Sequence, residues 1–84
     1  MHIKDVVETL LVPRVGEVEL TVEIELEEDA VIARVWKAVY CPAGKDAEPV
    51  AIYGGDDEML ARAAYSGAVL VLETLAAARE NRRK

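Results

Sequence analysis

The sequence predicts a small α+β domain in which an antiparallel sheet packs against a long C-terminal helix. Residues 17–27 alternate polar and apolar side chains without a break, which is typical of a strand with one buried and one solvated face. Residues 59–78 are mostly apolar and follow an acidic triplet, as expected for a helix whose first turn carries negative charge. The predicted order is a short N-terminal helix, a three-stranded meander and a long C-terminal helix (α-β-β-β-α), forming a single domain over residues 1–84.

The N-terminal segment, residues 2–12, has the spacing of a short amphipathic helix. Its apolar residues recur at offsets of three and four, namely Ile3, Val6, Val7, Leu10 and Leu11, and this spacing gives one apolar stripe. Its valine and threonine content leaves a strand as an alternative. Pro13 ends the segment in either case, because the residue before a proline avoids the helical region.

Two further strands are expected after the alternating one. Glu28 and Asp29 form a tight turn, and residues 30–40 are rich in Val, Ile, Trp and Tyr. A two-residue turn would place Glu23 opposite Arg34 and Leu20 opposite Lys37, whereas a three-residue turn would shift every pair. Residues 50–53 form a short third strand, which we place at the sheet edge because the preceding Pro49 cannot donate to a ladder.

The C-terminal helix is expected from residues 56–58 to about Arg79, with Asp56 as its N-cap. It is apolar over more of its circumference than one sheet face can cover, so a second copy of the protein is expected to cover the rest. Gly67 lies among small residues that let another backbone approach, either the protein's own sheet or a partner helix. The predicted dimer interface comprises Val35, Trp36, Ala63, Gly67, Leu70 and Val71.

Composition limits the partners and the location. The net charge of −6 argues against direct nucleic-acid binding and against anionic membrane surfaces. Arg62 and Glu73 interrupt the apolar run, so a membrane span is not expected. One cysteine and no signal-peptide layout indicate a cytoplasmic or recombinant soluble protein. The scarcity of Asn and Gln predicts thermostability. An idealised engineered protein with no natural role would show the same composition.

No catalytic, cofactor or metal site is predicted, so the protein is not expected to be an enzyme. His2 is the sole histidine and lies near the chain start, and Cys41 has no histidine near it in sequence. A base, a nucleophile and an anion-stabilising group therefore cannot be assembled.

The predicted function is a non-catalytic interaction or assembly module that forms a homodimer. An acidic inhibitor of the phage type, which mimics nucleic acid through its glutamate strand and binds a basic protein, is the alternative. The expected order of elements is similar to that of double-stranded-RNA-binding domains. Those domains open their last helix with basic residues, whereas Asp56, Asp57 and Glu58 stand here, so that function is not expected.

Overall fold

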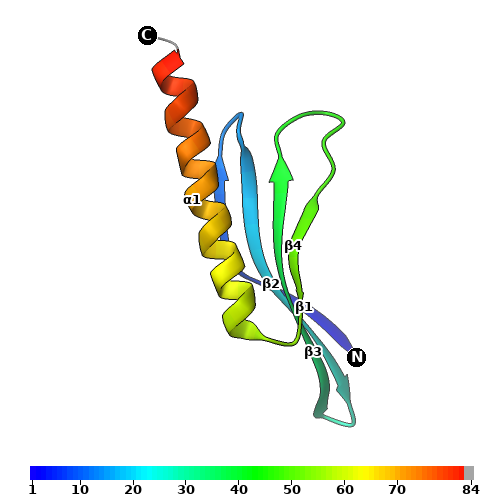
Figure 1. Ribbon diagram of the computed structural model, residues 1–84. Helices are drawn as coiled ribbons and strands as arrows, with labels where there is room; N and C mark the ends of the chain where they lie inside the picture. Colours follow the sequence, from blue (N-terminus) through cyan, green and yellow to red (C-terminus); the bar gives the residue numbers. More distant parts are fainter. Residues whose placement is uncertain (83–84) are drawn as a thin grey trace.

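The computed structural model describes residues 1–82, which form a four-stranded antiparallel sheet and a long helix on one of its faces (Figure 1). The strand order in the sheet follows the chain order, so each strand pairs with its neighbours in sequence. The elements are β1 (His2–Val12), β2 (Gly16–Glu27), β3 (Ala30–Pro42), β4 (Val50–Gly55) and α1 (Glu58–Arg82).

The predicted N-terminal helix is wrong, because residues 2–12 form strand β1, which makes the sheet four-stranded rather than three-stranded. β1 pairs with β2, and its register shifts between Val6 and Glu8. The extra residue at this β-bulge moves the following residues onto the other face of the sheet. Val6 and Leu11 therefore lie on the face of the β2 glutamates, whereas Leu10 and Val12 lie on the α1 side, so the apolar residues do not form one stripe. The likeness to double-stranded-RNA-binding domains disappears with the helix.

The turn between β2 and β3 has the expected two residues, but the predicted register is wrong by one. Glu28 and Asp29 have positive φ angles of 52° and 66°, which is the pattern of a type I′ hairpin. Glu27 pairs with Ala30 as a two-residue turn requires, and a shift then follows that leaves Ile32 unpaired. Beyond this bulge Glu23 lies opposite Val35, and Leu20 lies opposite Ala38.

The third predicted strand is confirmed as β4, which lies at the edge of the sheet. The helix is also confirmed, although its N-cap is Asp57 rather than Asp56. An Asp57 carboxylate oxygen accepts a hydrogen bond from the Leu60 backbone N–H at 3.1 Å. Near the other end of α1, the Arg79 guanidinium donates to the carbonyl oxygen of Arg14 in the β1–β2 turn, which fixes the helix along the sheet.

The core lies between α1 and the apolar side of β2. Val18, Leu20, Ala38, Ala61 and Leu72 have no exposed surface. The opposite face of the sheet, which carries the β2 glutamates, is not covered by any described element. The β2–β3 hairpin extends past the start of α1 (Figure 1), so its tip is exposed on both faces.

Candidate interaction surfaces

The side of α1 that faces away from the sheet is apolar, and we call it the outward stripe. Leu60, Leu70 and Val71 in this stripe are 55%, 66% and 58% exposed. The spacing of three and four residues places all its members on one side of the helix. The stripe consists of Leu60, Ala63, Gly67, Leu70, Val71 and Thr74.

The polar side chain of the stripe, Thr74, already has a hydrogen-bond partner within the helix. The Thr74 hydroxyl donates to the Leu70 carbonyl oxygen at 2.8 Å, so Thr74 can present its methyl group to a neighbour without losing a hydrogen bond. A Cβ atom added to Gly67 would have no heavy atom within 4 Å. The protein's own sheet therefore does not require glycine at this position, and another helix could approach closely there.

The structure brings together four of the six predicted interface residues. Ala63, Gly67, Leu70 and Val71 are all exposed on the outward stripe. Val35 and Trp36 are consecutive strand residues, so they point to opposite faces of the sheet. Val35 pairs with Glu23 on the open face, and Trp36 lies on the α1 side.

Arg62 covers the indole of Trp36 and connects α1 to two strands. The guanidinium carbon lies 5.8 Å from the ring centroid, within the range of a cation–π contact. The same side chain donates to Glu58 at 2.8 Å and lies 3.7 Å from a carboxylate oxygen of Glu8. These carboxylates raise the pKa of Arg62, so it stays charged over Trp36.

An apolar groove of about 520 Å³ lies between α1 and the edge strand β4. Val50 and Ile52 are 53% and 44% exposed, and Leu75 of α1 is 45% exposed. The eight lining residues are Tyr40, Val50, Ile52, Ala64, Gly67, Ala68, Val71 and Leu75. Gly67 and Val71 belong to both the groove and the outward stripe, so the two surfaces are continuous.

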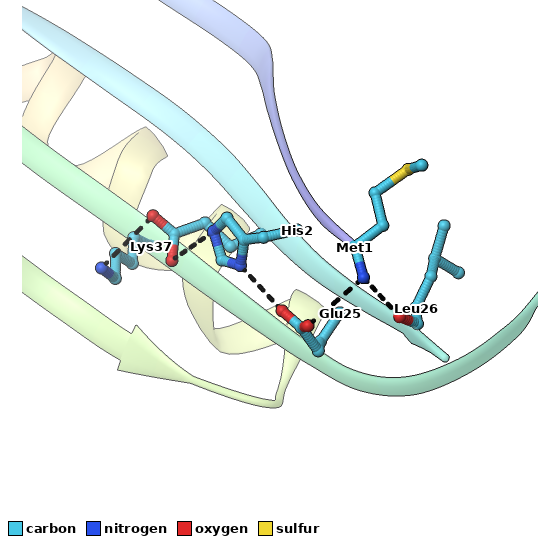
Figure 2. A network of polar contacts seen from close by, with 6 residues as sticks. Met1, His2, Glu25, Leu26 and Lys37 are labelled. Atoms are coloured by element: carbon cyan, nitrogen blue, oxygen red, sulfur yellow. Dashed lines mark hydrogen bonds and ion pairs between the residues drawn. The ribbon is translucent and has the colours of Figure 1, made fainter. Parts of the chain in front are cut away.

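The open face of the sheet is acidic, but basic groups lie against some of its glutamates (Figure 2). His2 Nδ1 lies 3.1 Å from a carboxylate oxygen of Glu25, and the Met1 ammonium lies 3.6 Å from the other. Glu23 is 3.6 Å from Lys37 Nζ and 3.7 Å from His2 Nε2. The hydrogen bond from His2, followed by the Met1 charge, outweighs desolvation and lowers the pKa of Glu25.

The other end of the glutamate row is not neutralised in this way. Within residues 1–82, ion pairs involve Glu23 and Glu25 but not Glu17 or Glu19. The protonated Glu17 carboxyl can donate a hydrogen bond to Glu19, and this contact, followed by desolvation and the Glu19 charge, raises the pKa of Glu17. Burial, with the charges of Glu19 and Glu17, raises the pKa of the Cys41 thiol, which disfavours the nucleophilic thiolate.

Among residues 1–82, no group of three His, Cys, Asp or Glu side chains could hold a metal ion. By its length and composition α1 could cross a membrane, and most of it is exposed. A single such helix is weak evidence for a membrane protein, because a signal sequence or the mostly buried core helix of a soluble protein has the same length and composition.

Sequence reasoning missed the groove beside β4. Val50 and Ile52 alternate along a short edge strand, which indicates one apolar face. The sequence does not reveal that α1 leaves this face uncovered, because that depends on where the helix crosses the sheet. No family model, no curated protein and no solved structure matches the chain.

Proposed function

We propose that the protein is a non-catalytic interaction module that forms a homodimer through the outward stripe of α1. The observation that carries this proposal is the exposure of Leu60, Leu70 and Val71 beside the open backbone of Gly67. Their neighbours on the stripe are alanine, glycine and an internally bonded threonine. Such a surface has almost no polar group that would lose hydration when a partner covers it.

A second copy fits the stripe because the surface is self-complementary. Two α1 helices that cross near Gly67 would place each glycine against the other backbone, while Leu60, Leu70 and Val71 pack around the crossing. Burying a large aliphatic side chain contributes about 1.5–3 kcal/mol, so covering the exposed half of each contributes roughly 1 kcal/mol. Helices about 37 Å long provide room for several such contacts per copy.

The positions of the charged residues on α1 also support a dimer contact at the outward stripe. Arg62 and Glu73 lie on the flank of the helix, away from the outward stripe, by their spacing from Gly67. A partner on the stripe therefore buries no charged group, which would be costly without a partner charge. The open face carries the β2 glutamates and could not be covered by another copy without opposing like charges.

Sedimentation velocity at micromolar concentration tests the association. We expect a dimer that becomes monomeric when Leu70→Lys places a charge in the stripe, while Glu73→Lys on the flank leaves the dimer intact. The dimer should respond little to salt, because its contacts are apolar. A monomer for the unaltered protein at 100 μM would refute the proposal.

Disulfide cross-linking tests the position of the crossing. In a Cys41→Ser background, Gly67→Cys should oxidise to a covalent dimer, because a disulfide requires Cα atoms about 4.4–6.8 Å apart. Glu73→Cys serves as the matched control and should remain uncross-linked. A dimer that cross-links through residue 73 but not residue 67 would place the contact elsewhere on the helix.

The uncovered glutamates of β2 favour a second candidate function, an acidic inhibitor that occupies a basic groove of a nucleic-acid-binding protein. Glu17 and Glu19 form no ion pair within residues 1–82, so their charge is available to a basic partner. Binding to such a partner should weaken steeply as ionic strength rises. Glu17→Gln with Glu19→Gln should also weaken it, and an unchanged affinity would exclude this function.

A further inference from the structure

We infer that β4 and the groove beside it bind an extended peptide segment of a partner protein as a fifth strand of the sheet. β4 ends the strand order, and an edge strand presents unpaired backbone N–H and C=O groups. Extended peptides commonly bind proteins by adding to such an edge, where main-chain hydrogen bonds supply affinity and pockets select alternate side chains.

The position of α1 provides the pocket for those side chains. Ala64, Ala68 and Leu75 line the groove from the helix, opposite Val50 and Ile52 of β4. Neighbouring strands lie about 4.8 Å apart, so a fifth strand would lie just beyond β4, at the open side of the groove. Every second side chain of the segment would then point toward α1 and fill the groove.

The bulge in β4 limits the length of the pairing. The register between β3 and β4 shifts between Ala38 and Val39, so Ile52 is the extra residue of β4. The ladder of β4 with β3 is therefore regular only over Val50 and Ala51 before the bulge, and Pro49 lacks a donor. A short segment with apolar residues at alternate positions matches this length.

The charges at the two ends of β4 define the partner further. Glu48 precedes the strand, and Asp56 and Asp57 follow it. If β4 paired antiparallel with β4 of a second copy, Glu48 of one copy would approach the Asp56 region of the other, and like charges placed opposite each other destabilise a sheet. The charge pattern instead favours a segment whose apolar core is flanked by Lys or Arg on both sides.

Fluorescence anisotropy with a labelled peptide, Lys-Lys-Val-Thr-Val-Thr-Val-Lys-Lys, tests the inference. We expect saturable binding in the micromolar range, with amide NMR shifts concentrated in residues 50–52 and in the groove side of α1. Binding should weaken at least tenfold for Ile52→Lys, whose side chain is already partly exposed. It should weaken as well for a peptide with proline at both threonine positions, or with glutamate in place of each lysine.

Val35→Lys is the matched control, because Val35 is a partly exposed apolar strand residue on the opposite face, and it should leave peptide binding unchanged. Circular dichroism should show that both variants are folded. Absence of saturable binding, or equal binding by the proline peptide, would overturn the inference.

Two other occupants of the groove and β4 would give results different from those expected for a peptide. If a fluorescent fatty acid binds the groove and the peptide does not, the groove binds an acyl chain and the inference fails. If Ile52→Lys converts a dimer to a monomer, a second copy occupies β4 and the inference also fails. The inference does not rest on the proposed dimer, because Leu70→Lys should abolish dimerisation and leave peptide binding intact.

Discussion

Leu72 of α1 packs into the same buried cluster as Val18 of β2, and neither side chain has exposed surface. This contact joins the helix to the central part of the sheet, and Val15 from the β1–β2 turn completes the buried cluster. The helix is otherwise weakly buried, since Ala61 is its other fully buried residue. The attachment of α1 to the sheet therefore depends on few side chains.

Leu72→Ala should lower the free energy of unfolding by about 3 kcal/mol, because truncating a buried leucine removes transfer free energy and leaves a cavity. Met59→Ala provides the comparison, since Met59 is 80% exposed on the same helix and should cost much less. Urea denaturation followed by circular dichroism measures both. Equal losses for the two variants would show that α1 is not held by Leu72.

Gly16→Ala should destabilise the protein by about 2 kcal/mol or more. Gly16 has a φ of 157°, and an added Cβ would lie 2.8 Å from the carbonyl oxygen of Cys41 and 3.0 Å from the ring of Tyr40. A backbone oxygen cannot move away cheaply. Gly54→Ala is the matched control, because nothing lies within 4 Å of its added Cβ, and thermal denaturation should show little change for it.

Asp57→Ala should cost about 1 kcal/mol, the typical value of a lost N-cap. Its carboxylate accepts the Leu60 N–H at 3.1 Å, and this backbone donor would lose its partner. Its neighbour Asp56 lies just outside the helix, so Asp56→Ala should have a smaller effect. Guanidinium unfolding of the two variants decides between them, and a larger loss for Asp56→Ala would move the cap to that residue.

The contributions of Glu17 and Glu25 to the stability of the protein should depend on pH in opposite directions. The pKa of Glu17 is raised, mainly by the hydrogen bond it shares with Glu19. A carboxyl with a raised folded pKa contributes stability that is present below its unfolded pKa, near 4.5, and lost as pH rises through the folded pKa. Glu17→Gln should therefore raise the melting temperature at pH 7 and leave it nearly unchanged at pH 3.

Glu25→Gln should have the reverse effect. The pKa of Glu25 is lowered, mainly by the hydrogen bond from His2. Its stabilising contribution is present above the unfolded pKa and lost as pH falls through the lower folded pKa. The variant should melt at a lower temperature than the parent at pH 7, and the difference should disappear in strong acid. Melting curves from pH 2 to 7 test both variants, and shifts of the same sign would contradict this assignment.

The sequence by itself determined the alternating strand, the edge position of residues 50–53 and the long C-terminal helix. These features are local, because period-two alternation, a proline and an acidic helix start act through neighbouring residues. It also indicated the two-residue turn at Glu28 and Asp29. Four of the interface residues predicted from helical spacing lie together on the outward stripe for the same reason.

Only the tertiary structure decided the features that depend on pairing between distant segments. The apolar residues of β1 have a helical spacing, but the segment is a strand because it pairs with β2 across a bulge between Val6 and Glu8. The bulge at Ile32 shifts the β2–β3 register after a correctly predicted turn. The groove at β4 exists because α1 crosses the sheet without covering its edge. Bulges and crossing positions are set by how the elements pack together, so the pattern of a single segment does not contain them.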